Sequence, residues 1–163
     1  MYRIGILTVS DRGARGERED RSGPALAEAI LALPGAEVVA QAVVPDERPE
    51  IEAALRRWVA EGLDLILTTG GTGFSPRDVT PEATRAVIER EAPGLAEAMR
   101  AESLRITPHA MLSRAVAGMA GSTLIVNLPG SPKAACENLR TLLPALPHGL
   151  DKLRGDPSEC ARP

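Results

Sequence analysis

Hydrophobic positions along the chain follow two spacings, one typical of buried strands and one typical of amphipathic helices. Between residues 48 and 61, apolar side chains fall at positions i, i+3, i+4, i+7 and i+8, which predicts a helix with one apolar stripe. Trp58 belongs to that stripe, so we expect it in the core rather than stacked on a ligand. The segments 3–9 and 63–68 are short, apolar and bounded by turn residues, which predicts buried strands.

The same patterns predict the remaining elements. Strands are expected at 3–9, 37–44, 63–68, 114–119 and 123–127, and helices at 23–33, at 48–61, from 81, from about 93, and at 131–146. Thr80 and Ser131 each precede a proline and are predicted as helix N-caps. We expect one domain over residues 1–150 and a frayed C-terminal tail over 151–163.

Alternation of strands and helices implies a largely parallel sheet with helices on both faces. The last two predicted strands are joined by only a short Ala-Gly-Ser link, which allows a hairpin. The expected fold is therefore an α/β three-layer sandwich with a mostly parallel, mixed central sheet.

Composition narrows the classes of function. A length of 163 residues suits one domain, and the net charge of −3, with 2% aromatic residues, gives neither the basic surface nor the stacking platforms of a nucleic-acid binder. The apolar runs are too short for a membrane-spanning helix. Cys136 and Cys160 are far apart and form no zinc motif, which agrees with a reducing compartment and predicts a cytoplasmic location.

Polar clusters follow four of the predicted strands. They are Ser10-Asp11, Pro45-Asp46, Thr69-Gly70-Gly71-Thr72-Gly73, and Asn127-Leu128-Pro129-Gly130-Ser131. In open α/β sheets, ligands bind beyond the carboxyl ends of the strands, so parallel strands would bring all four clusters to one edge. We therefore expect them to form one site.

The segment 70–73 has three glycines in four positions, which lets a phosphate or a ring approach backbone N–H groups. It is neither a Walker A loop nor a dinucleotide-binding fingerprint. A tight strand-to-helix turn is the alternative interpretation. The hydroxyls of Thr68, Thr69 and Thr72 favour a ligand-binding loop.

Asp78 follows the glycine loop, where a carboxylate could bind Mg²⁺ together with substrate phosphate. Alternatively, it could accept hydrogen bonds from local backbone N–H groups or pair with Arg77. For Asp11 and Asp46 the same two interpretations remain open, namely binding a ligand and stabilising the local loop. Phe74, in the same loop, could cover a ligand ring or close the loop onto the core.

Together these motifs resemble the MogA/MoaB family of molybdenum cofactor biosynthesis proteins. The residues that carry the resemblance are Thr8 to Arg12, Val44-Pro45-Asp46, Thr68 to Gly73, Asp78 to Glu82, Leu112-Ser113-Arg114, and Asn127 to Pro132. They span nearly the whole chain in the order of the family.

The resemblance implies a molybdopterin adenylyltransferase, which transfers AMP from Mg²⁺-ATP to the terminal phosphate of molybdopterin and releases pyrophosphate. It implies that Asp46 and Asp78 are the catalytic, Mg²⁺-binding carboxylates. The implied substrate-binding residues are Ser10, Asp11, Thr69, Gly70, Gly71, Thr72, Gly73, Ser113, Asn127, Pro129, Gly130 and Ser131. It further implies a homotrimer and a molybdate insertase as the downstream partner. The composition and the short apolar runs predict no nucleic-acid or membrane partner.

Three rival interpretations share this fold. A catalytically silent MoaB-like protein would bind or carry molybdopterin, although the presence of both carboxylates favours catalysis. Proteins of the insertase or competence-damage type use a similar domain within longer chains. A purely structural trimeric module would leave the four polar clusters without a purpose.

Overall fold

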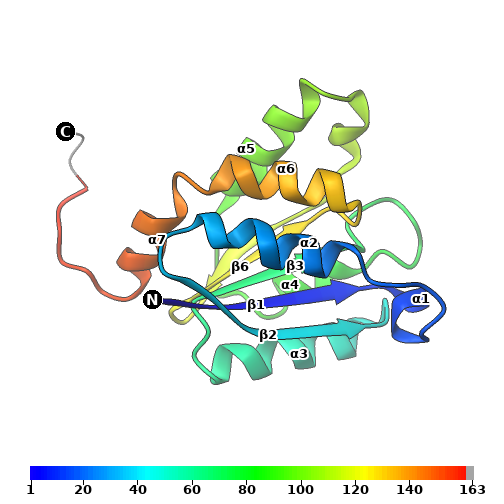
Figure 1. The fold of residues 1–163 in the computed structure, drawn as a ribbon, viewed down its shortest axis with the longest axis horizontal. Helices are drawn as coiled ribbons and strands as arrows, with labels where there is room; N and C mark the ends of the chain where they lie inside the picture. Colours follow the sequence, from blue (N-terminus) through cyan, green and yellow to red (C-terminus); the bar gives the residue numbers. More distant parts are fainter. Residues whose placement is uncertain (161–163) are drawn as a thin grey trace.

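The computed structural model describes residues 1–160 and contains a six-stranded sheet (Figure 1). The strands are β1 (Tyr2–Val9), β2 (Ala36–Val44), β3 (Leu65–Thr69), β4 (Arg90–Glu91), β5 (Ala117–Ala120) and β6 (Thr123–Leu128). Their spatial order is β2-β1-β3-β6-β5-β4. The first four strands in this order are parallel, whereas β5 is antiparallel to both β6 and β4, so the predicted hairpin and mixed sheet are confirmed.

Helices cover both faces of the sheet, which confirms the predicted three-layer α/β architecture (Figure 1). They are α1 (Asp11–Ala14), α2 (Ser22–Ala29), α3 (Arg48–Ala60), α4 (Thr80–Arg85), α5 (Pro93–Leu104), α6 (Pro132–Leu142) and α7 (Leu146–Leu153), with short 3-10 helices η1 (Ile30–Ala32) and η2 (Pro108–Leu112). Helices α2, α5, α6 and α7 pack on one face, and α3 and α4 on the other. Within residues 1–160, no helix combines the length and the apolar character needed to cross a membrane.

Trp58 is 2% exposed and belongs to the core beneath α3, as its position on the apolar stripe predicts. Gly5 of β1 makes room for its ring, because a Cβ at Gly5 would lie only 2.7 Å from Trp58. Ile4 and Ile6 face the opposite layer of helices. The central strand β1 thus joins the two cores and fixes the position of its carboxyl end.

Several boundaries differ from the predictions: β3 covers Leu65–Thr69 instead of 63–68, and the helix predicted over 23–33 is α2 followed by η1. Helix α4 begins at Thr80 rather than after it, and the Thr80 hydroxyl donates to the carbonyl of Gly70 at 2.9 Å instead of capping the helix. Strand β5 begins only at Ala117. The predicted long last helix is divided into α6 and α7, while Ser131 does cap α6 by accepting from the N–H of Ala134 at 3.4 Å.

The segment after residue 150 is tied to the start of the chain. Helix α7 includes residues 151–153, so the frayed tail predicted from 151 is wrong for these residues. Tyr2 donates its hydroxyl to Asp151 at 2.8 Å. Arg154 donates to both carboxylate oxygens of Asp64, at 2.7 and 2.8 Å, and the N–H of Arg3 donates to one of them at 2.7 Å.

We expect Asp64→Asn to lower the free energy of unfolding by about 1 kcal/mol at pH 7, which is the order expected for a partly exposed ion pair with added hydrogen bonds. Burial opposes ionisation of Asp64, but the hydrogen bonds from Arg154 and Arg3 are together stronger and hold its pKa below the ordinary value. The stabilisation is therefore present above the pKa of an unfolded aspartate and is lost as the pH falls through the lower folded pKa. Urea unfolding at several pH values should show the variant and the wild type converging in acid. A constant difference at every pH would contradict this role.

Candidate active site

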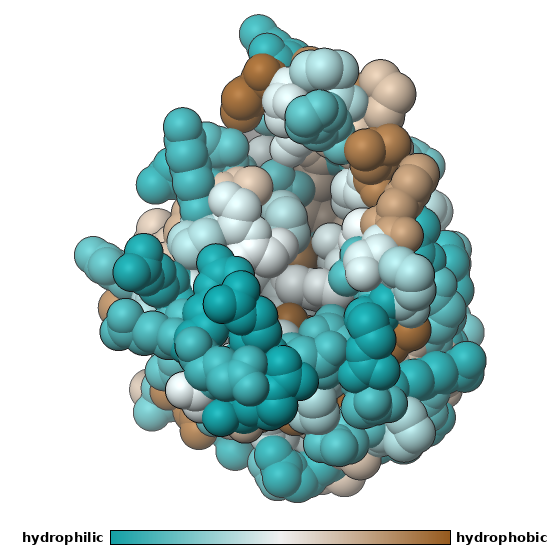
Figure 2. All heavy atoms as spheres, turned by 90° about the vertical axis from the view of Figure 1, so that its right-hand side faces the viewer, coloured by the Kyte–Doolittle hydropathy of each residue, from teal (hydrophilic) through white to brown (hydrophobic). Residues whose placement is uncertain are grey.

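The four parallel strands bring the predicted polar clusters to one edge of the sheet. This edge lies at the right of Figure 1, and Figure 2 views it directly as a largely polar face with a hollow near its centre. The chain leaves β1 through α2 on one face of the sheet and leaves the adjacent β3 through α4 on the other, which is the topological position where α/β proteins bind ligands.

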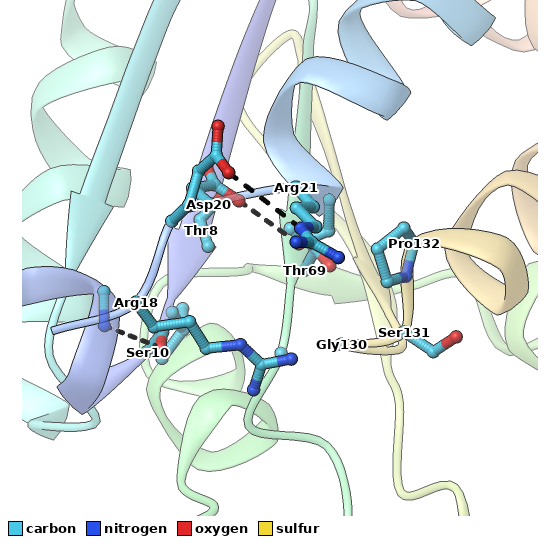
Figure 3. A pocket seen from close by; sticks show the side chains of 14 residues that line it. Thr8, Ser10, Arg18, Asp20, Arg21, Thr69, Gly130, Ser131 and Pro132 are labelled. Carbon is cyan, nitrogen blue, oxygen red and sulfur yellow. Dashed lines mark hydrogen bonds and ion pairs between the residues drawn. The ribbon is translucent and has the colours of Figure 1, made fainter.

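The first cavity, of about 380 Å³, opens between the ends of β1 and β3 and the starts of α2 and α6 (Figure 3). Of the predicted site residues, it contains Ser10, Thr69, Gly70, Gly130 and Ser131. Its size lies within the range of about 300–1,000 Å³ that is typical of small-molecule sites.

A second cavity, of about 270 Å³, lies beneath η2 and α6. It contains the predicted residues Thr72, Gly73, Ser113 and Pro129, and its wall is rich in apolar groups. Gly70 and Gly130 line the first cavity, whereas Thr72, Gly73 and Pro129 line the second, so the glycine loop and the turn at 129–130 separate the two. Nine of the twelve predicted substrate-binding residues therefore divide between two neighbouring cavities, whereas Asp11, Gly71 and Asn127 line neither.

Glycine is required in the loop between the cavities. Gly70 has a φ of +97°, and a Cβ there would lie 2.3 Å from the carbonyl oxygen of Val9. Gly71 has a φ of +67°, and its Cβ would lie 2.2 Å from the Thr80 hydroxyl. The alternative interpretation as a tight turn thus describes the backbone correctly, although the turn also forms a wall of both cavities.

The threonines of this loop do not all serve a ligand. Thr68 is fully buried and its hydroxyl accepts a hydrogen bond from Asn127 at 2.9 Å, so our prediction that it is offered to a ligand is wrong. Thr69 donates to the carbonyl of Pro129 at 2.7 Å, which fixes the β3 and β6 ends together. Phe74 is 69% exposed, which rules out the idea that it closes the loop onto the core.

Asp11 and Asp46 hold each other's backbone. The N–H of Asp11 donates to Asp46 Oδ2 at 2.9 Å, and the N–H of Asp46 donates to Asp11 Oδ1 at 3.0 Å. Arg77 binds both oxygens of Asp11, at 3.0 and 2.9 Å, and Glu47 at 2.8 Å, rather than pairing with Asp78 as one alternative suggested. The hydrogen bond from Arg77 lowers the pKa of Asp11, whereas burial above all, and then the nearby charges of Asp11 and Asp78, raise the pKa of Asp46.

Asp78 is held in place by the loop around it. Its Oδ2 accepts the N–H of Ser75 at 2.9 Å, and its carbonyl accepts from Arg114 Nη2 at 2.8 Å. Arg114 also donates to the carbonyl of Gly73 at 2.8 Å and forms an ion pair with Glu82. Within residues 1–160, Oδ1 of Asp78 and Oδ1 of Asp46 accept no hydrogen bond, so each carboxylate retains one oxygen for a ligand.

Asn127 does not belong to either cavity. Its side chain is fully buried, donates to Thr68 and Thr84 at 2.9 and 2.8 Å, and accepts the N–H of Val116 at 3.2 Å. The prediction that Asn127 contacts substrate is therefore wrong for this structure. The amide instead joins β6 to α4 and to the segment before β5.

We expect Asn127→Ala to lower the free energy of unfolding by about 2–4 kcal/mol, because it leaves buried polar groups without partners. Asn138→Ala is the matched control. Asn138 is also buried, but it donates only to the hydroxyl of Ser103 and to the carbonyl of Ala134, one turn earlier in α6. Urea unfolding should show a smaller loss for the control, of about 1 kcal/mol. If Asn127→Ala kept its stability and lost affinity for molybdopterin, the structural role would be disproved.

Several residues of the site had no clear signal in the sequence. Arg18 and Asp20 line the first cavity, but they come from a charged loop to which no role could be assigned. The Thr8 hydroxyl donates to Asp20 at 2.7 Å, which positions this loop against β1. Arg114 was visible only as part of the family resemblance, because its contacts lie more than thirty residues away in the chain.

Comparison with known proteins agrees with this geometry. Residues 5–148 match the family described as "Probable molybdopterin binding domain". The chain belongs to this family. The MogA/MoaB resemblance drawn from the strand-end motifs is thereby confirmed.

Solved and curated members of the family are similar over nearly the whole chain. The crystal structure of the molybdopterin biosynthesis enzyme MoaB from Thermus thermophilus is 58% identical, with a TM-score of 0.91 over 98% of this chain and 100% of that one. Molybdopterin adenylyltransferase of Helicobacter pylori strain J99 is 43% identical over 94% of this chain and 88% of its own length.

Longer relatives also contain this domain. Gephyrin of Dictyostelium discoideum is 44% identical and the Drosophila melanogaster molybdenum cofactor synthesis protein cinnamon is 46% identical. The matches cover 94% and 95% of this chain, but only 23% and 26% of the lengths of the two relatives. The same family domain thus occurs both nearly alone and as a minor part of larger proteins.

Proposed function

We propose that this protein is a molybdopterin adenylyltransferase that transfers AMP from ATP to the terminal phosphate of molybdopterin. The observation that carries the proposal is that Asp46 and Asp78, which line neither cavity themselves, lie against the glycine loop that borders both. Each carboxylate has one uncommitted oxygen among residues 1–160. Support comes from relatives named molybdopterin adenylyltransferase that are 43–47% identical. The presence of both carboxylates favours the enzyme over a silent carrier.

The two cavities suit different substrates. In the second cavity, Ile106 and Leu112 are exposed by 61% and 43%, and they offer apolar surface to a pterin ring beside the hydroxyl of Ser113. The first cavity is lined by two arginines, Arg18 and Arg21, together with the carboxylates of Glu19 and Asp20, and the two guanidiniums suit the phosphates of a nucleotide. Two substrates bound in this way would meet at the glycine loop, where their phosphates must react.

The chain's residues contribute positioning and electrostatics. An oxygen of the molybdopterin phosphate attacks the α-phosphorus of ATP, and pyrophosphate leaves with the electrons of the broken bond. Such transfers depend on alignment and charge neutralisation more than on a protein nucleophile. Backbone N–H groups around Gly71 and Gly73 are available for phosphate oxygens because these two residues have no side chains to cover them.

The carboxylates fit a magnesium ion. Mg²⁺ is commonly held by one or two carboxylates together with substrate phosphates and water, and Asp46 and Asp78 each retain one oxygen for it. Partial burial raises the pKa of Asp46 because it disfavours the ionised carboxylate. A cation bound beside this carboxylate would favour the ionised form again. When bound with ATP, the ion would neutralise phosphate charge.

We further propose the homotrimer and the cytoplasmic location that the sequence predicted, together with a molybdate insertase that consumes the adenylylated product. The occurrence of this domain within longer cofactor-biosynthesis proteins, including a bifunctional protein of Chlorobaculum tepidum, supports a coupled downstream activity. Sedimentation equilibrium would test the trimer directly.

The deciding experiment incubates the protein with molybdopterin, ATP and Mg²⁺ and measures both pyrophosphate and adenylylated molybdopterin. We expect equal amounts of the two products. A folded sample that binds molybdopterin and forms neither product would disprove the enzyme and favour the carrier. Omission of Mg²⁺, with a chelator present, should stop the reaction without preventing binding of molybdopterin.

A further inference from the structure

One guanidinium in the first cavity has no partner in the part of the chain that the structure describes. Arg18 comes from the loop between α1 and α2, and Figure 3 shows its side chain extending past Ser10 with the guanidinium on the side of Gly130. An arginine directed into a cavity without a carboxylate partner retains its donors for a ligand.

The acidic residues near Arg18 are engaged elsewhere. Glu17 binds Arg15 through both carboxylate oxygens, at 2.8 and 3.0 Å. Both oxygens of Asp20 accept hydrogen bonds, one from β1 and the other from the start of α2. Glu19 Oε2 lies 4.0 Å from Nε of Arg21, another arginine of the loop. The unpaired state of Arg18 within residues 1–160 is therefore a result of how the whole loop is arranged.

The wall opposite Arg18 consists mainly of backbone. Gly70 and Gly130 approach each other so closely that a Cβ on Gly130 would lie 3.4 Å from the Gly70 Cα. Neither residue brings a side-chain charge, and the two carboxylates that line the cavity, Glu19 and Asp20, come from the same loop as Arg18 rather than from this wall. A polyphosphate lying along it would bring its negative charge to the guanidinium on the other side.

We propose that Arg18 binds the β- and γ-phosphates of ATP in the first cavity and retains the pyrophosphate as it leaves. The inference rests on the proposed adenylyl transfer, in which the bond from the α-phosphorus to the bridging oxygen breaks and pyrophosphate takes the electron pair. The negative charge on the leaving group increases in that step. A guanidinium matches two phosphate oxygens at once, so it favours the triphosphate and pyrophosphate over AMP.

The test compares Arg18→Ala with Arg15→Ala, which removes the same charge from the same loop but from a residue already paired with Glu17. Calorimetric titration with ATP, pyrophosphate and AMP would be done on each protein with Mg²⁺ present. We expect Arg18→Ala to weaken ATP and pyrophosphate binding about 10-fold or more, the size of one charged hydrogen bond, and to leave AMP unchanged. Arg15→Ala should bind all three as the wild type does, and Arg18→Lys should lie between.

Three results would overturn the inference. The first is an ATP affinity that is the same in the wild type and in Arg18→Ala. The second is an AMP affinity that falls in Arg18→Ala by the same factor as the ATP affinity. The third is a wild type that binds no ATP. Turnover assays separate this failure from failure of the proposed function. A wild type that binds ATP through Arg18 but forms no adenylylated product would contradict only the enzyme, whereas an active Arg18→Ala with unchanged KM for ATP would contradict only the role of Arg18.

Discussion

Asp78→Asn is expected to lower the turnover number for adenylyl transfer by a factor of about 100 or more while molybdopterin still binds. Loss of one preorganised electrostatic group in an active site costs on the order of 10²–10³ in kcat. The asparagine can still accept the N–H of Ser75, as Asp78 Oδ2 does at 2.9 Å, so the loop should keep its shape. What disappears is the negative charge beside Asp46 that would hold Mg²⁺ and the transferring phosphoryl group.

The measurement combines product formation with fluorescence titration of molybdopterin. The matched control is Glu47→Gln, which removes a carboxylate charge next to Asp46 in the sequence. The side chain of Glu47 is 49% exposed and forms an ion pair with Arg77. We expect the control to retain most of its turnover. An Asp78→Asn variant as active as the control would show that the carboxylate of Asp78 has no role in the reaction.

The features that the sequence could predict are those that depend on local pattern. The apolar stripe placed Trp58 in the core, and the parallel strands had to bring Asp11, Asp46 and the glycine loop to one edge. The glycine-rich sequence of the loop predicted an open backbone, and Gly70 and Gly71 adopt the positive φ that glycine allows. These predictions needed only periodicity, strand direction and backbone sterics.

Side-chain direction was not predictable in the same way. Asn127 occupies a strand end among site residues, yet its amide turns inward to satisfy Thr68 and Thr84, from different elements. The contacts of Arg114 with the Asp78 loop likewise depend on segments that meet only in the folded chain. A polar residue at the edge of a sheet can face the ligand or the core, and the choice depends on which buried groups lack partners.

Gly70→Ala should be the most damaging small substitution in the loop, lowering the free energy of unfolding by about 2–4 kcal/mol. Two costs add. A residue with a Cβ pays about 1–2 kcal/mol for left-handed backbone, and steric overlap in a packed site costs about 1–3 kcal/mol. The overlap here is with the backbone carbonyl oxygen of Val9, which would lie 2.3 Å from the alanine Cβ and cannot rotate away.

Gly16→Ala separates the two costs. Gly16 has a φ of +71°, but a Cβ there would meet nothing within 4 Å, so only the backbone term applies. Alanine also reduces the entropy of the unfolded chain, which offsets roughly 0.4–1 kcal/mol of that term at both positions. Urea unfolding should therefore show a loss of about 1 kcal/mol or less for Gly16→Ala. Equal losses in the two variants would mean that β1 moves to accommodate the methyl group, and the wall between the cavities would then be less rigid than its contacts indicate.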